Sequence, residues 1–401
     1  MKPPVWLLAL GATMLAQTIS SFMGQCLPVV APLLTANIGL APERIGNLSS
    51  LTSLGSVLFL AFGSPLLARF GPIRSLQLGT GLSICAMAVA ALGWWPALVL
   101  ASLLLGIGYG PTPPAGSRIL AATAPPQHRT LIFSIKQAGA PAGGALAGLI
   151  VAPIAMAWGW SPALLVAVAA GFITIAAIAP LRMAMDVERE PARSIHPRDI
   201  FRLATVLGPI QTLRASPQML TVTALAISFS IAQGALYSFS VTYLTQRGLS
   251  LVDAGFAYAC LQGAGVFARV LLGWLADRTG RPSLNLTIQA YIGAACLLGY
   301  AFMPLNLPLT TVAIIATACG FFCASWNGIY MAEVVRLAPS GMVAEATSAS
   351  TLFTFLGYVA GPSLFALAVP LWGWRVPYAV VAGQLVVMAV LQSLLLLRRT
   401  R

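Results

Sequence analysis

The chain has 401 residues, of which 58% are apolar and only 8% are charged, whereas about a quarter of the residues in a typical soluble domain are charged. This composition excludes a soluble globular domain and indicates a protein that lies in a lipid bilayer. The formal net charge of +13 would suggest a nucleic-acid partner in a soluble chain. Because nearly all the basic residues fall between apolar segments, we expect no nucleic acid among the partners.

Apolar runs of membrane-spanning length recur along the chain. A run of about 20 apolar residues crosses the hydrocarbon core as a helix, because lipid offers no partners for backbone polar groups. The runs predict twelve spans, at residues 5–34, 46–67, 76–93, 97–122, 131–157, 161–180, 218–243, 254–276, 284–303, 309–334, 347–369 and 376–397. Lys2 before an apolar run resembles a signal peptide, but no small-residue cleavage site follows, so we expect a retained first span.

Residues 181–217 form the only polar segment of any size, with ten of the 31 charged residues. Within it, residues 196–214 are compatible with an amphipathic helix on the membrane surface. We therefore expect an all-α integral membrane protein, in which twelve transmembrane helices form two pseudo-symmetric six-helix bundles. The first bundle takes residues 1–180, a cytoplasmic linker residues 181–217, and the second bundle residues 218–401.

The arginines between the spans are unevenly divided between the two sides of the membrane. If the N-terminus is cytoplasmic, the outer loops hold only Arg44, Arg247 and Arg375, and the inner loops hold the rest. By the positive-inside rule, both termini are cytoplasmic. We expect a multi-pass protein of the cell inner (plasma) membrane.

Six cysteines and two histidines are the candidate metal ligands. The cysteines lie within apolar runs and form no Cys-x-x-Cys pair, so we interpret them as small buried residues. They are Cys26, Cys85, Cys260, Cys296, Cys319 and Cys323. His128 and His196 lie in loops without ligand spacing, and no hydrolytic triad is present. We expect no metal, no cofactor and no enzyme.

The two halves of the chain repeat each other. Trp-Gly-Trp at residues 158–160 recurs at residues 372–374, and Gly143 and Gly357 each lie 15 residues before it. The loops at residues 68–74 and 277–283 correspond at an offset of 209. Two six-helix units of parallel topology are typical of many secondary transporters, with the substrate site near the midplane.

The second of these loops carries a family signature. Residues 273–281 read Gly-Trp-Leu-Ala-Asp-Arg-Thr-Gly-Arg and match in full the signature Gly-x-Leu-Ala-Asp-Arg-x-Gly-Arg of the major facilitator superfamily. The chain resembles this family over its whole length, which implies alternating access by two rocking bundles. Asp277, Arg278 and Arg281 can bridge helix ends at the inner face in the outward-open state. Because Ala68 replaces the aspartate in the first-half loop, we expect the stronger latch in the second half.

Two other spans bear on the type of transport. The fifth span at residues 137–148, Gln-Ala-Gly-Ala-Pro-Ala-Gly-Gly-Ala-Leu-Ala-Gly, is similar to the signature of the superfamily's antiporters but is one residue short. We interpret its small residues as close helix packing. In the fourth span, Ser102 stands where drug antiporters have an arginine associated with proton handling, which opposes drug efflux.

Arg269 lies inside the eighth span, eight residues before Asp277, or about 12 Å along a helix axis. A bilayer-centre arginine costs at least about 2.5 kcal/mol, and no Asp or Glu lies in the middle of any span. A planar guanidinium suits two-point contact with a carboxylate, so we predict an anion site. The alternative is that Arg269 reaches the inner surface or binds a neighbouring backbone carbonyl.

The oxalate/formate and monocarboxylate porter branches have an arginine at this place, eight residues before the loop aspartate, where it contacts the substrate carboxylate. This resemblance supports a monocarboxylate as the substrate. Those branches also have a lysine on the first or eleventh span, which this chain lacks.

Neutral polar and aromatic residues at similar depth are predicted to line the substrate site. Each alone is as compatible with helix packing, but together they describe a small polar pocket with aromatic walls. They are Gln17, Ser21, Tyr109, Thr112, Gln233, Tyr237, Gln262, Trp326, Asn327, Tyr330 and Tyr358.

Further charged residues are candidates for gating or coupling. Lys136, about two turns into the fifth span, either extends to the inner surface, which we favour, or receives the anion as a second cation. Arg118 is expected to anchor the fourth span at the membrane interface. Glu333 and Arg336, three residues apart on one helix face, predict an inner-face pair.

These residues predict a secondary transporter of a small organic anion, a monocarboxylate, working as a monomer. Coupling to a proton through Glu333 or Asp253 is favoured over anion exchange. The alternatives are a drug/proton antiporter and a non-transporting sensor or scaffold.

Overall fold

The computed structural model describes residues 4–125, 128–196, 217–339 and 342–399. Twelve helices in these ranges are long and apolar enough to cross a membrane, which confirms the predicted all-α fold of twelve spans. Residues 197–216, which include nearly all of the predicted amphipathic helix, lie outside the described residues.

The first six spans are built from nine α-helices and one π-helical turn. They are α1 (Val5–Asn37), α2 (Ile45–Phe62) with α3 (Ser64–Phe70), α4 (Pro72–Ala90), α5 (Trp95–Tyr109) with α6 (Thr112–Thr123), α7 (Arg129–Leu146) with η3 (Ala147–Val151) and α8 (Ala152–Trp158), and α9 (Trp160–Ile178). A short turn η4 (Ala179–Leu181) and helix α10 (Arg182–Met185) follow.

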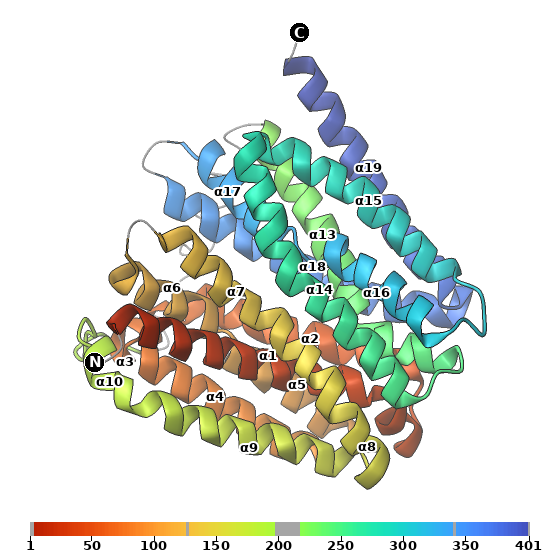
Figure 1. Cartoon of the computed structure of the whole chain (residues 1–401). Helices are drawn as coiled ribbons and strands as arrows, with labels where there is room; N and C mark the ends of the chain where they lie inside the picture. The colour runs from red at the N-terminus through yellow and green to blue at the C-terminus, as the bar shows by residue number, and fades with distance from the viewer. Residues whose placement is uncertain (1–3, 126–127, 197–216, 340–341, 400–401) are drawn as a thin grey trace. The chain divides into compact units, whose positions relative to one another are not determined.

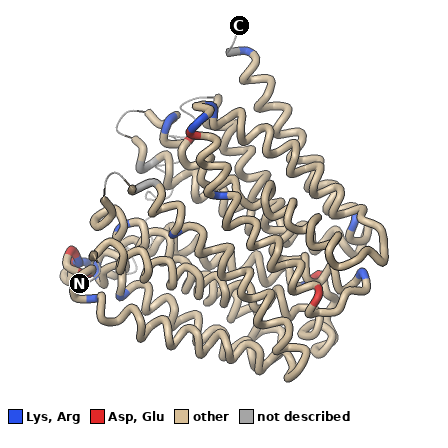
Figure 2. The backbone as a smooth tube through the Cα atoms, viewed as in Figure 1, with Lys and Arg blue, Asp and Glu red and all other residues tan. Residues whose placement is uncertain are grey.

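The last six spans contain seven helices. They are α13 (Pro217–Gln246), α14 (Leu251–Thr279), α15 (Pro282–Phe302), α16 (Leu309–Cys323) with α17 (Asn327–Leu337), α18 (Val343–Trp372) and α19 (Arg375–Arg399). Figure 2 shows that most charged residues lie at helix ends or between helices, and that few lie in the long middle parts of the helices. This is the distribution that the cost of burying charge in lipid requires.

The chain divides into two compact units. One contains residues 1–40 and 51–202, and the other contains residues 41–50 and 203–401. In the first unit, α1 packs against α6, α7 and α9, and α4 packs against α5 and α9. In the second, α14 runs beside α16, α13 beside α18 and α15 beside α19 (Figure 1).

Glycines at equivalent places bring helices together in both units. A Cβ at Gly106 would collide with the carbonyl oxygen of Thr52, and a Cβ at Gly320 would collide with that of Leu261. Gly106 and Gly320 are 214 residues apart, which is the offset between the two Trp-Gly-Trp motifs. Thr52 and Leu261 are 209 residues apart, which is the offset between the two loops. The repeat therefore extends from sequence to helix packing, since only glycine permits this approach of two backbones.

Two spans are interrupted at equivalent positions. The fourth span breaks at Gly110 and Pro111, between α5 and α6, and the tenth breaks at residues 324–326, between α16 and α17. Gly110 and Ala324 are again 214 residues apart. The sequence analysis expected continuous helices here, because both runs stay apolar through the break. Interrupted helices at corresponding places in two repeats are the pattern that marks transporter binding sites.

Cys85 departs from the expectation for the cysteines. It is exposed on α4, whereas Cys26, Cys319 and Cys323 are buried and Cys260 and Cys296 lie between these extremes. The expectation of burial was wrong for Cys85, because hydropathy does not distinguish a helix face toward lipid from one toward protein.

Gly320→Ala is expected to lower the free energy of unfolding by about 1 to 3 kcal/mol, because the added methyl meets rigid backbone. The control is Gly299→Ala, where no atom lies within 4 Å of the new Cβ and which should gain up to about 1 kcal/mol of helix propensity. Denaturant unfolding in detergent measures both. Equal effects of the two substitutions would contradict the close-packing account.

Candidate functional site

The interruption in the tenth span lies beside Arg269. Helix α16 ends at Cys323, and α17 begins after its N-cap, Trp326. Arg269 of α14 is half-buried, and its guanidinium donates a hydrogen bond of 3.4 Å to the carbonyl oxygen of Ala324 in the break. The alternative that Arg269 binds a neighbouring carbonyl therefore describes a real contact. A neutral carbonyl orients the guanidinium but does not neutralise its charge.

Gln233 joins three helices around the same break. Its side-chain oxygen accepts hydrogen bonds from Trp326 Nε1 at 3.0 Å and from the Tyr358 hydroxyl at 2.7 Å. The Trp326 ring also stacks on Phe229, with ring centres 5.9 Å apart. Predicted site residues on α13 and α18 are thus brought together with the N-cap of α17.

A second polar group lies between α13 and α14. Tyr237 meets the ring of Tyr258 edge-on at 6.4 Å, and Gln262 donates a hydrogen bond of 2.6 Å to the Tyr258 hydroxyl. Tyr258 was not among the predicted site residues, although it lies four residues before Gln262 and so on the same helix face.

Five buried amide oxygens in the second unit accept no hydrogen bond from any described residue, those of Gln218, Gln262, Gln289, Asn327 and Gln392. Two of them, Oε1 of Gln262 and Oδ1 of Asn327, belong to predicted site residues. Such orphaned acceptors are uncommon in folded proteins and call for an explanation. Tyr330 is different, because its hydroxyl donates to Thr223 at 3.2 Å and so joins α17 to α13.

The first unit gathers its predicted site residues at the other interruption. Gln17 of α1 donates a hydrogen bond of 2.8 Å to the hydroxyl of Tyr109, the last residue of α5. Thr112, the first residue of α6, is buried. Ser21 instead donates to the carbonyl oxygen of Ala140 at 2.6 Å, so it joins α1 to α7.

Two cations of the first unit lie in contrasting surroundings. Arg118 donates to the backbone carbonyl of Glu188 at 2.9 Å and lies 3.8 Å from its carboxylate, so it ties α6 to the segment after α10. Lys136 has only 1% of its surface exposed. The expectation that Lys136 extends to the inner surface was wrong, because Gly116 on α6 leaves room for its side chain inside the unit.

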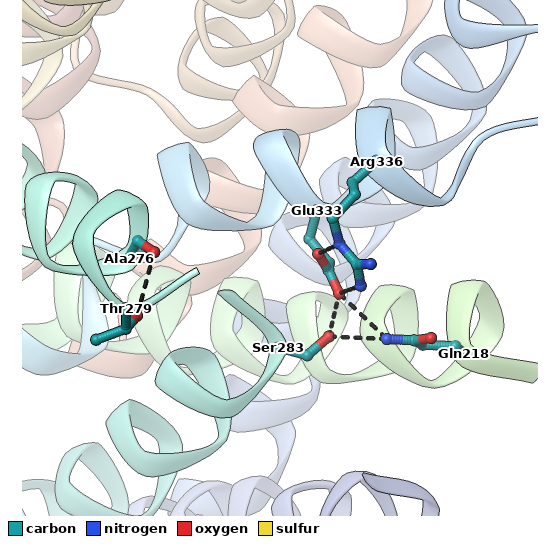
Figure 3. Close-up of polar contacts among 6 residues, drawn as sticks. All are labelled: Gln218, Ala276, Thr279, Ser283, Glu333 and Arg336. Carbon is teal, nitrogen blue, oxygen red and sulfur yellow. Dashed lines mark hydrogen bonds and ion pairs between the residues drawn. The ribbon is translucent and has the colours of Figure 1, made fainter. Parts of the chain in front are cut away.

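Glu333 is the centre of a buried cluster at the end of α17 (Figure 3). Its carboxylate accepts two hydrogen bonds from Arg336, at 2.6 and 2.7 Å, one from Gln218 at 3.2 Å and a short one from Ser283. The predicted pairing of Glu333 and Arg336 is confirmed. The added donors come from α13 and α15, so this fully buried carboxylate fastens three helices.

The charged residues of the signature loop are exposed within the second unit. Asp277 is exposed and forms no hydrogen bond or ion pair with a described residue, and Arg278 lies over the Trp274 ring at 5.3 Å. Arg281 is the exposed N-cap of α15. The latch assigned to Asp277, Arg278 and Arg281 in the outward-open state stays a prediction.

In the first-half loop, Asp186 supplies a carboxylate that the sequence comparison of the loops did not find. It accepts hydrogen bonds from the backbone N–H groups of Ile73 and Arg74, at 2.7 and 3.1 Å, at the start of α4. Burial raises the pKa of Asp186, while these two N–H groups and the charges of Arg182 and Arg189 oppose the rise. Asp186 was missed because it lies more than 110 residues away from its partners along the chain.

Asp186→Ala is expected to lower the free energy of unfolding by about 1 to 2 kcal/mol, because the start of α4 loses its capping acceptor. Glu190→Ala removes a nearby exposed carboxylate that pairs with Arg193 at 3.7 Å, and such a pair contributes about 0 to 1 kcal/mol. Thermal unfolding in detergent compares them. A loss no larger for Asp186→Ala than for Glu190→Ala would contradict the capping role.

Comparisons with known proteins identify the family of the chain. The family model described as Major Facilitator Superfamily matches residues 13–362. The chain is 24% identical over 392 residues to a hexuronate transporter of Bacillus subtilis (strain 168), which covers 94% of this chain and 90% of that protein. It is also 24% identical over 323 residues to a gallate transporter of Pseudomonas putida, covering 74% of this chain and 70% of that protein.

Solved structures share the fold. The peptide transporter POT in complex with sulfate has a TM-score of 0.77 and 15% sequence identity, with 98% of this chain and 95% of that chain covered. At this identity the likeness concerns the fold alone.

Proposed function

Because the chain belongs to the Major Facilitator Superfamily and its named relatives are transporters rather than enzymes, we propose that it moves a small hydroxylated monocarboxylate across the membrane by alternating access. The observation that carries the proposal is the guanidinium of Arg269, held at the α16–α17 break by the carbonyl of Ala324. The fork of a guanidinium matches the two oxygens of a carboxylate.

The surroundings of Arg269 support a substrate with hydroxyl groups. Gln262 lies seven residues before Arg269 on α14, and so on the same helix face. Asn327 begins α17, three residues after Ala324. The orphaned oxygens of Gln262 and Asn327 can each accept a hydrogen bond from a ligand hydroxyl. Hexuronates and gallate, the substrates in the names of two relatives, combine one carboxylate with several hydroxyls.

Aromatic side chains at the same break favour a flat or partly apolar substrate body. Trp326, Phe229 and Tyr358 come together through the ring stacking and hydrogen bonds around Gln233. Such side chains bind a ring face by dispersion and by the hydrophobic effect. A carboxylate contact at Arg269 and a ring contact at Tyr358, which is only partly buried, together give the site both charge and shape selectivity.

We expect glucuronate or gallate to raise the melting temperature of the wild-type protein in detergent, because a ligand that binds only the folded state stabilises it. Arg269→Ala should abolish this shift, and Arg269→Lys should weaken binding by about tenfold or more, equal to about 1.4 kcal/mol, because a point charge cannot reproduce the fork. Arg398→Ala removes one exposed positive charge on α19 and is the matched control.

An equal shift in Arg269→Ala and the wild type would contradict the assignment of the site. Tetraphenylphosphonium belongs in the same screen. Stabilisation by this cation, with none by the carboxylates, would favour a drug antiporter in place of an anion carrier.

The transport direction and coupling follow from a second experiment. In liposomes that contain the purified protein, an inward pH gradient is expected to drive accumulation of glucuronate or gallate above equilibrium. A protonophore should remove this accumulation, because the gradient supplies the free energy. Accumulation that ignores the protonophore but needs a counter-anion inside would identify an exchanger.

A further inference from the structure

Lys136 is one of only two lysines in the chain, whereas the other 20 of its 22 basic residues are arginines. It is also among the largest fully buried side chains of the described residues, with 1% of its surface exposed. An arginine stays protonated under all ordinary conditions, while a lysine can release its proton when it is buried. Among the described residues of the first unit, the one buried cation is thus of the type that can change its charge.

The surroundings of Lys136 are shaped to hold it. Its Cε lies 2.6 Å, and its Nζ 3.2 Å, from the place that a Cβ would take at Gly116 of α6. The side chain therefore fills the space left by the missing Cβ. Thr13 of α1 borders the same place, at 3.6 Å, so the lysine lies between the helices α1, α6 and α7.

None of these helices offers Lys136 a negative charge. The sequences of α1, α6, α7 and η3 contain no Asp or Glu. The charged residues on them are Arg118 on α6, which is bound to Glu188, and Arg129 at the start of α7. Thr13 donates its hydroxyl to the carbonyls of Ala9 and Leu10. No described residue forms a hydrogen bond or ion pair with Lys136.

An enclosed ammonium without an opposite charge costs several kcal/mol, and such a group either binds an anion or gives up its proton. We propose that Lys136 carries the proton that accompanies the anion in transport, as a deeper account of the proposed function and resting on it. In the enclosed state without bound anion the side chain is a neutral amine. When α1, α6 and α7 rearrange and admit water from one side of the membrane, the amine takes one proton from a hydronium ion and becomes ammonium, and it keeps this proton while the anion crosses. When the helices next open to water on the other side, the ammonium releases the proton there and becomes the neutral amine again.

The internal repeat places a neutral residue at the position equivalent to Lys136. At the offset of 214 that relates Gly143 to Gly357, the counterpart of Lys136 is Ser350, which is buried in the second unit. The same helix position is therefore filled by a small neutral residue in one unit and by a long titratable one in the other. The two carboxylates considered as proton carriers already have hydrogen-bond donors, since Glu333 is bound by Arg336 and Asp253 accepts the Ser250 hydroxyl.

The test compares two modes of transport in liposomes with radiolabelled glucuronate and, in parallel, gallate. Counterflow, with the anion on both sides and no pH gradient, needs binding and reorientation but no net proton movement. Accumulation driven by an imposed pH gradient needs the coupling proton. Lys136→Met is expected to keep counterflow and to lose the accumulation, and Lys136→Arg, whose charge is fixed, is expected to lose the accumulation as well. Gln137→Met, at the exposed neighbouring position on α7, should retain both activities.

A direct measurement of protons gives a second readout. In weakly buffered detergent solution, addition of saturating glucuronate to the wild type is expected to change the proton concentration, as reported by a pH dye, and addition to Lys136→Met is not. Gly116→Ala, which pushes against Cε of Lys136, should reduce the signal while leaving the protein folded in a thermal unfolding scan.

The outcomes separate the two proposals. If neither anion moves in the wild type by either mode, the proposed function fails and this inference fails with it. If the wild type shows both modes and Lys136→Met accumulates the anion as well as the wild type does, the inference alone is overturned. If folded Lys136→Met loses counterflow too, Lys136 serves binding or reorientation, and its assignment as a coupling residue is likewise overturned.

Discussion

The structure depends on the requirement that a backbone in lipid must satisfy its hydrogen bonds within its own helix. Within the described residues, the fourth and tenth spans break at equivalent places, where α5 gives way to α6 and α16 to α17. A break releases carbonyl and N–H groups from the helix, and these groups need partners or line a polar space. Arg269 contacts Ala324 at one break, and Gln17 contacts Tyr109 at the other. The polar side chains therefore gather where the helices are interrupted.

The two breaks are equivalent in position but differ in chemistry. At the offset of 209 that relates Thr52 to Leu261, the counterpart of Arg269 is Leu60. Beside it, Phe59 packs against Gly110, the counterpart of Ala324. The same backbone arrangement thus receives an apolar contact in the first unit and a cation in the second. An internal repeat supplies the framework twice, and single substitutions decide which copy can bind a charged group.

The sequence predicts the spans well, because hydropathy is a sum over about 20 residues and tolerates errors of detail. It does not predict the breaks, since the runs around Pro111 and Ser325 remain apolar and the sum does not change. It misses Asp186 because the partners of this carboxylate are backbone groups of a loop far away in sequence. It misplaces Lys136 because the space that encloses the side chain is left by Gly116 of another span. Each failure has the same reason, because the sequence of one segment does not show which residues of other segments pack against it.

Glu333 and Lys136 show that this fold treats two buried charges differently. Glu333 is completely buried, and its carboxylate accepts hydrogen bonds from three residues. Two of them lie on other helices, and the third, Arg336 on the same helix, donates two hydrogen bonds. That degree of compensation is what a permanently charged buried group requires. Lys136 is as deeply enclosed, yet the helices around it provide neither a carboxylate nor a hydrogen bond from a described residue. Because the chain surrounds buried Glu333 with donors in one unit, the missing compensation of Lys136 in the other supports the proposal that its charge is present only during part of the transport cycle.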